Sequence, residues 1–126
     1  MRAALASLLD LPINEVPHFL REEKNSAYDF WEGVTDFCLA QGYVFMMLPA
    51  VNFKWASDAV YHAISGPSPR GNGIYHTVVG CNGKIVHDPH PSKSGLSGDP
   101  SEWTFEFLVR AAPSAGNGEA KGDGNG

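Results

Sequence analysis

The chain of 126 residues has the size of one domain, and its 43% hydrophobic and 18% charged residues are ordinary for a globular protein. A formal net charge of -5 and the absence of any run of Lys and Arg argue against a nucleic-acid partner. No apolar stretch approaches the roughly 20 residues that span a bilayer, and the N-terminus lacks the pattern of a signal peptide. We therefore expect a soluble, cytoplasmic protein without a membrane partner. Its two cysteines, Cys38 and Cys81, are expected to stay reduced.

Two helices are predicted in the first third of the chain. Strong helix formers occupy residues 2–9, although no Ser, Thr, Asp or Asn precedes them to cap the first turn, and Pro12 stops this helix. The second helix starts after Ser26, which can cap it, and ends at Gly42. Its apolar residues recur at three- and four-residue spacing and predict a stripe facing the core: Phe30, Trp31, Val34, Phe37 and Cys38.

Strands are predicted after the second helix. Residues 43–48 form a continuous apolar run, which indicates a buried strand, whereas residues 52–59 fit either a helical turn or a loop. Four further strands are expected over residues 60–65, 74–80, 84–88 and 103–110. Helices followed by an antiparallel sheet are typical of the α+β class. We assign residues 1–113 to this domain and residues 114–126 to a disordered Gly-rich tail.

The two strands around Asn82-Gly83 carry the sharpest motif. If these two residues form a type I′ turn, His76 and Asp88 point to opposite faces of the hairpin. If Cys81 joins them in a three-residue loop, with Gly83 in the left-handed conformation, His76 lies directly opposite Asp88, with Cβ atoms about 5 Å apart. Only the second arrangement brings the two side chains together.

A carboxylate at that distance can fix the tautomer of the imidazole and leave its other nitrogen to take a proton from a nucleophile. The alternative is an ordinary cross-strand polar pair at a solvated edge. The nucleophile is not evident in the chain. Cys38 belongs to the predicted core stripe, and Cys81 lies at the far end of the hairpin. The loop serines lack the glycine-flanked turn that presents a nucleophile: Ser65, Ser68 and Ser92.

Several segments together resemble a group of small phage and bacterial proteins with a papain-like cysteine peptidase fold, related in pattern to the double-glycine bacteriocin-processing peptidases. The segments are Arg-Ala-Ala-Leu-Ala-Ser-Leu-Leu-Asp-Leu-Pro from Arg2, Glu-Val-Pro-His-Phe from Glu15, Ser-Gly-Pro-Ser-Pro-Arg-Gly from Ser65, His-Thr-Val-Val from His76 and Val-His-Asp-Pro-His-Pro-Ser from Val86. The resemblance covers nearly all of the chain except the tail. It implies N-terminal helices packed on an antiparallel sheet, with His76 as general base and Asp88 as its orienting acid, and no cofactor.

The resemblance also implies a catalytic Cys that this sequence does not contain. In proteins of this pattern the Cys lies two residues before the position of Arg2, within Gly-Asn-Cys or Gly-Asp-Cys, and that position precedes Met1. Either the gene product starts upstream, or this is a shortened form that has lost catalysis. The uncapped first helix favours an upstream start, because a thiolate at a helix start is stabilised by the helix dipole and by a nearby imidazolium. This chain is expected to be inactive.

The leading hypothesis is thus a Cys-His-Asp hydrolase or transferase that acts on a peptide or amide bond through a thioester. The first alternative is a non-catalytic module that keeps the groove and binds a peptide, with Arg70 pairing a substrate carboxylate and Trp55 in the groove wall. Either protein is expected to be a monomer.

A metal site is the third hypothesis. Its ligands would come from one hairpin and its exit loop: His76, His87, Asp88 and His90. Strand alternation disfavours it, because His87 and Asp88 point to opposite faces. We therefore expect no metal.

Overall fold

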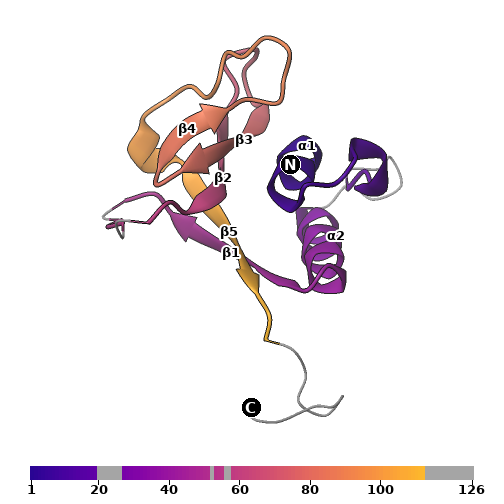
Figure 1. Cartoon of the computed structure of the whole chain (residues 1–126). Helices are drawn as coiled ribbons and strands as arrows, with labels where there is room; N and C mark the ends of the chain where they lie inside the picture. The colour runs from indigo at the N-terminus through magenta and orange to yellow at the C-terminus, as the bar shows by residue number, and fades with distance from the viewer. Residues whose placement is uncertain (20–26, 52, 56–57, 113–126) are drawn as a thin grey trace, which may run out of the picture.

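The computed structural model describes residues 1–19, 27–51, 53–55 and 58–112. Over these residues the chain forms two α-helices and an antiparallel five-stranded sheet of order β1-β5-β2-β3-β4, which confirms the predicted α+β class. The elements are α1 (Arg2–Leu9), the 3-10 turn η1 (Ile13–Glu15), α2 (Ala27–Ala40), β1 (Tyr43–Pro49), β2 (Tyr61–Pro67), β3 (Tyr75–Cys81), β4 (Lys84–His87), the 3-10 turn η2 (Pro100–Glu102) and β5 (Thr104–Arg110). Both α-helices lie to one side of the strands (Figure 1).

The predicted helix over residues 2–9 is confirmed. It begins at Arg2 without a side-chain cap and ends at Leu9, and the following Asp10 has a left-handed φ of 56° that turns the chain away. The N–H of Leu11 then donates to the carbonyl of Ala6 at 2.9 Å, which satisfies a helix-end carbonyl. The predicted cap of the second helix, Ser26, lies outside the described residues, as does the tail of residues 114–126.

The helices and the sheet share a core in which Leu5, Val16, Val34 and Cys38 are buried. The expected stripe of α2 faces this core, and Leu108 of β5 packs against it. Cys38 is completely buried, and this burial raises the pKa of its thiol to about 11. Its predicted role as a small core hydrophobe is therefore confirmed.

The opposite face of the sheet has its own core of Ile64, Val78 and Phe105. Because side chains alternate along a strand, Phe105 and Leu108 point to opposite faces of β5. Trp55 and Trp103 pack against this second core from the connections before β2 and before β5. The sheet is thus covered by helices on one face and by aromatic loop residues on the other.

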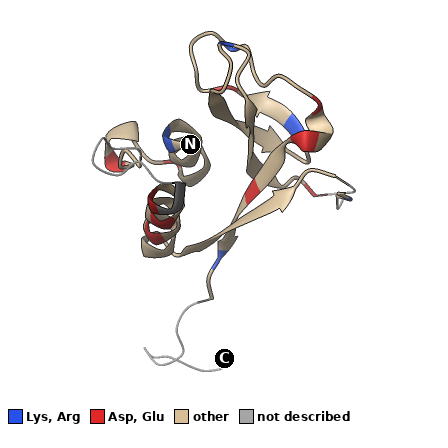
Figure 2. Ribbon diagram, turned by 180° about the vertical axis from the view of Figure 1, so that it is seen from behind, with Lys and Arg blue, Asp and Glu red and all other residues tan. Residues whose placement is uncertain are grey.

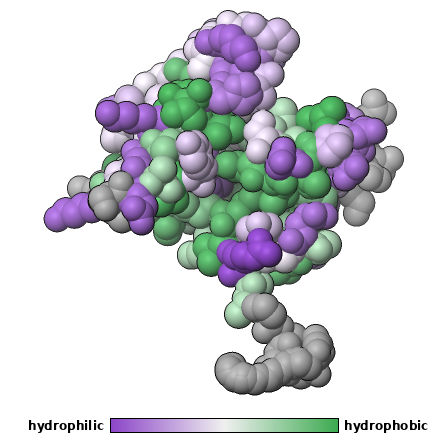
Figure 3. All heavy atoms as spheres, in the orientation of Figure 1, coloured by the Kyte–Doolittle hydropathy of each residue, from purple (hydrophilic) through white to green (hydrophobic). Residues whose placement is uncertain are grey.

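Charged and apolar side chains are distributed unevenly over the surface. Seen from behind, acidic residues gather on α2, while Lys and Arg are scattered (Figure 2). In the orientation of Figure 1, hydrophobic residues remain visible between the strands and the helices (Figure 3).

The prediction that the first strand is buried is wrong. The apolar run predicts a buried strand, but β1 pairs only with β5 among the described residues and lies at an edge of the sheet. Val44, Met46 and Met47 are each more than 40% exposed. An apolar run indicates a strand but does not determine its position in the sheet.

Candidate active site

A histidine and an aspartate meet where β3 begins and β4 ends. His76 is the second residue of β3, and Asp88 follows directly after β4. Nε2 of His76 lies 2.7 Å from Oδ1 of Asp88, and the two side chains are 13% and 5% exposed. The sequence therefore predicted the right contact, although the hairpin reaches it by another route.

The turn between β3 and β4 has two residues, not the three that the sequence analysis required. Cys81 pairs with Lys84, and Asn82 and Gly83 have φ angles of 49° and 83°. Positive φ at both central residues is the signature of a type I′ turn, for which Asn-Gly is the preferred pair. The expected three-residue loop is wrong.

A bulge in β4 places the His76 and Asp88 side chains on the same face of the sheet. With the two-residue turn alone, His76 and Asp88 would point to opposite faces. The register shifts between Val79 and Gly80, so that Val86 is an extra residue in β4. One extra residue reverses the side on which every later side chain emerges, and Asp88 therefore faces His76.

The loop after β4 holds the Asp88 carboxylate in place. The backbone N–H of His90 donates to Oδ1 at 2.9 Å, and that of Gly95 donates to Oδ2 at 2.7 Å. Nζ of Lys93 donates to the Asp88 carbonyl at 2.8 Å. Lys93 and Gly95 both have positive φ, which folds the loop back over the carboxylate.

These contacts keep Asp88 ionised. Burial by itself raises the pKa of this carboxyl, but the hydrogen bonds from His76, His90 and Gly95 outweigh it and lower the pKa to about 2. A pocket of about 360 Å³ opens beside Asp88, between β4 and the loop that carries Lys93. Because Asp88 accepts from Nε2, the neutral ring carries its proton there and leaves Nδ1 as an acceptor, with no hydrogen-bond partner among the described residues.

Neither thiol of the chain reaches this pair. Cys38 is buried in the helix-side core. Cys81 ends β3 five residues beyond His76, which corresponds to about 16 Å of extended strand.

The three serines weighed from the sequence have other partners. Ser65 Oγ lies 2.8 Å from the hydroxyl of Thr77, and the buried Ser68 accepts a backbone hydrogen bond at 3.1 Å within its own turn. Ser92 lies 2.9 Å from Nδ1 of His90 in an exposed turn. Among the described residues, none of the three serine hydroxyls has a hydrogen bond to His76.

The two predicted substrate-binding residues lie at opposite ends of the sheet. Arg70 is exposed in the β2–β3 connection, at the same end as His76. Trp55 instead stacks on His62, with ring centroids 5.0 Å apart, and His62 pairs with Gly80 about 13 Å along β3 from His76. The structure does not bring Trp55 to the His76–Asp88 pair, and both binding roles stay predictions.

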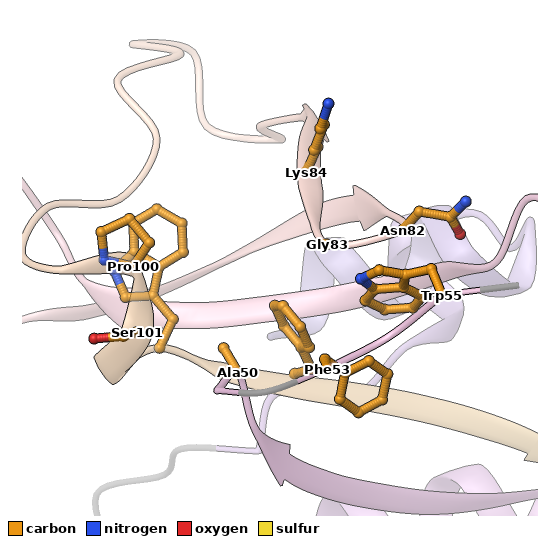
Figure 4. Close-up of a pocket in the computed structure, with 10 residues that line it drawn as sticks. Ala50, Phe53, Trp55, Asn82, Gly83, Lys84, Pro100 and Ser101 are labelled. Atoms are coloured by element: carbon orange, nitrogen blue, oxygen red, sulfur yellow. The ribbon is translucent and has the colours of Figure 1, made fainter.

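Trp55 lines a second pocket. It has a volume of about 300 Å³ and lies beside the β3–β4 turn, where Phe53 and Trp55 sit beneath Gly83 and Lys84 points away from them (Figure 4). Neither His76 nor Asp88 lines it.

The residues of the metal hypothesis do not form a metal site. Across the part of the chain that the structure describes, no three His, Cys, Asp or Glu residues are arranged to hold an ion. The rings of His76 and His90 stand edge to face with centroids 6.1 Å apart. His87 is exposed.

Sequence reasoning missed a buried acid, Glu106, which is 1% exposed. Its Oε1 accepts from Ser65 at 3.0 Å, whereas its buried Oε2 has no partner among the described residues. Burial raises the pKa of this carboxyl to about 7, against the opposing effects of Ser65 and of the Met1 amino group. A polar residue at an inward position of an apolar strand was the available signal.

His62 was missed as well, and it is completely buried. Its Nε2 accepts the Gly83 N–H at 3.0 Å, so the proton lies on Nδ1, which donates to the carbonyl of Ala63 at 2.9 Å. Burial lowers its pKa, which the bond to Ala63 only partly opposes. His62 therefore acts as a neutral clamp between β2 and the β3–β4 turn.

Comparisons with protein-family models, with curated proteins and with solved structures give no match to this chain. None of the helices in the described parts is long and apolar enough to cross a membrane.

Proposed function

We propose that His76 and Asp88 are the general base and the orienting acid of a papain-like Cys-His-Asp site that acts on a peptide or amide bond. The observation that carries this proposal is the 2.7 Å contact between Nε2 of His76 and Oδ1 of Asp88. A buried, ionised carboxylate in that position fixes the imidazole tautomer and stabilises the imidazolium that forms when His76 accepts a proton.

In the proposed reaction, Nδ1 of His76 carries the proton from one step to the next. Nδ1 of His76 takes the proton of a thiol, and the thiolate attacks the carbonyl carbon of the substrate. The same nitrogen then gives the proton to the leaving amine as the thioester forms. Water hydrolyses the thioester with His76 again as the base. Asp88 remains ionised throughout, because its pKa is held at about 2.

The thiol has to come from outside the two cysteines of this chain. The sequence resemblance puts it directly before Met1, at the start of α1. Strand alternation adds a geometric demand: Thr77 contacts Ser65, which in turn contacts Glu106 on the face that carries α1, so His76 points to the opposite face. A thiol before Met1 therefore meets His76 only by reaching beyond the start of β3, where His76 lies.

The test supplies that thiol. A variant that carries Gly-Asn-Cys in front of Met1 is treated with iodoacetamide between pH 5 and 9, and modification of the new Cys is followed by peptide mass spectrometry. If His76 activates the thiol, alkylation near pH 7 should be about tenfold faster than that of a free cysteine peptide, because only the thiolate reacts.

Three further variants separate activation from ordinary exposure. His76→Ala should return the rate to that of the free peptide, and Asp88→Asn should lower it partly. His87→Ala is the matched control, because His87 belongs to the same hairpin and is exposed. Equal alkylation rates of the added Cys in the Gly-Asn-Cys variant with His76 and in the same variant with His76→Ala would refute the assignment.

A further inference from the structure

The sheet edge formed by β1 combines two properties that seldom occur together. Val44 and Met46 point to one face of the sheet and are each 42% exposed, while Met47 points to the other face and is 45% exposed. An edge strand is normally protected by charges, by an internal proline or by a bulge. Between Tyr43 and Pro49 the strand has no charged residue, its proline is the last residue, and its pairing with β5 is regular.

The outward hydrogen-bonding groups of β1 follow from its register. The carbonyl of Gly42 accepts from Ala111 at 2.9 Å, and the N–H of Ala50 donates to Trp103 at 3.1 Å. Hydrogen-bonded pairs alternate in an antiparallel ladder, so the even-numbered residues of β1 bond to β5.

The odd-numbered residues Tyr43, Phe45 and Met47 therefore direct their N–H and C=O groups away from the sheet. Among the described residues none of these groups has a hydrogen-bond partner. The edge thus offers a row of free donors and acceptors beside exposed apolar side chains.

In place of the monomer expected from the sequence, we propose that β1 pairs with β1 of a second copy of this chain, antiparallel about a two-fold axis at Phe45, so that the two sheets join into one. In this register Tyr43 faces Met47 of the second copy, and each hydrogen-bonded pair uses only residues that have an N–H. Val44 faces Met46 of the second copy on one sheet surface, which covers two exposed apolar side chains at once.

The sequence of β1 is compatible with a second copy at this edge. The chain carries a net charge of -5, which opposes self-association, but the strand itself is uncharged and places no like charges across the axis. The continuous apolar sequence of β1 is typical of a central strand, and the dimer makes it one. The β3–β4 hairpin occupies the other edge of the sheet, so this interface does not depend on the proposed hydrolase site.

Sedimentation equilibrium of the full chain over a wide concentration range tests the dimer. Met47→Pro removes an outward N–H without touching the bonds to β5, and Met47→Lys places a charge in the interface. Either change should weaken the dimer about tenfold or more. Val51→Lys is the matched control, because Val51 is 46% exposed and lies outside the strand. Far-UV circular dichroism checks that every variant folds.

Cross-linking tests the register independently. Two variants in a Cys81→Ser background, Val44→Cys and Met46→Cys, are mixed and oxidised. Facing residues of a pair without hydrogen bonds have Cα atoms about 4.5 Å apart, which suits a disulfide. The mixture should therefore form mixed dimers faster than either variant forms its own dimer. A chain that stays monomeric at all concentrations, or a dimer that both Met47 variants leave unchanged, would overturn the proposal.

Discussion

Asp88 is held by three donors, and this makes it a source of stability at neutral pH. Its pKa of about 2 lies below the value of 3.8 expected for an unfolded chain, so the folded state is favoured when the carboxyl is ionised. The contribution is complete above about pH 4 and is lost as the pH falls towards 2, and it amounts to about 2 kcal/mol.

Replacing Asp88 by Asn should therefore lower the free energy of unfolding at pH 7 by about 2 kcal/mol and leave it nearly unchanged at pH 2. Urea denaturation followed by tryptophan fluorescence between pH 2 and 7 measures the difference. Asp36→Asn, on the exposed side of α2, is the control and should change little. An equal loss of unfolding free energy at every pH would show that the Asp88 side chain stabilises the fold through its packing and not through its charge.

His62 acts in the opposite protonation state. Its Nε2 accepts the Gly83 N–H, and this bond is lost if the ring is protonated. Because its pKa is lowered from 6.5, the unfolded chain takes up the proton first, and stability falls as the pH drops below about 6.5.

His62→Phe keeps the aromatic stacking but removes the acceptor, so it should cost about 1 kcal/mol at pH 7 and abolish this part of the pH dependence. Thermal and urea unfolding at pH 5 and pH 7.5 test the prediction. His87→Gln replaces an exposed histidine of the neighbouring strand and should leave the pH dependence intact. The role given to His62 fails if both variants behave alike.

At the scale of elements, the β3–β4 hairpin depends on one extra residue. Val86 creates the bulge that turns Asp88 towards His76. Deleting Val86 removes the bulge but leaves His87 opposite Val79, so the Asp88 side chain should stay on the same face as His76.

The pKa of Asp88, measured by NMR, reports the face on which its side chain lies. It should stay near 2 in the deletion variant, because the carboxylate keeps its bond to His76. Val86→Thr preserves the chain length and should also keep the low pKa. A rise towards the ordinary value of 3.8 after the deletion would show that pairing in this hairpin does not set the face of Asp88.

Only some features of these elements can be predicted from the sequence. The two helices and the strand ends were predictable, because apolar spacing and breakers such as Pro12 and Gly42 act locally. The meeting of His76 and Asp88 was predicted with the wrong turn, since the bulge at Val86 leaves no mark in the residue types. The position of β1 in the sheet depends on which strands pair, and no local pattern contains that information.

For the whole molecule, Glu106 is the most consequential titrating group, because it lies between the sheet and α1. The carboxyl is buried, one oxygen has no partner among the described residues, and the Met1 amino group is the nearby positive charge that favours ionisation. A folded pKa of about 7 against an ordinary 4.5 means that the unfolded chain ionises first. This group therefore stabilises the fold least above pH 7, and stability should decline as the pH rises from about 4.5 to 7.

Glu106→Gln removes the ionisable group while keeping the acceptor for Ser65. The variant should therefore be more stable than the unchanged protein only as the pH rises. The difference in unfolding free energy should grow from pH 4.5 to 7 and approach about 3 kcal/mol as an upper limit. Glu102→Gln, at an exposed position in η2, supplies the matched comparison. Because Asp88 and His62 titrate alike in both proteins, subtracting the two stability curves isolates Glu106 together with the Met1 amino group to which it is coupled. A difference that is constant across this range would mean that Glu106 is ionised in the folded protein throughout, and that the Met1 amino group compensates its burial.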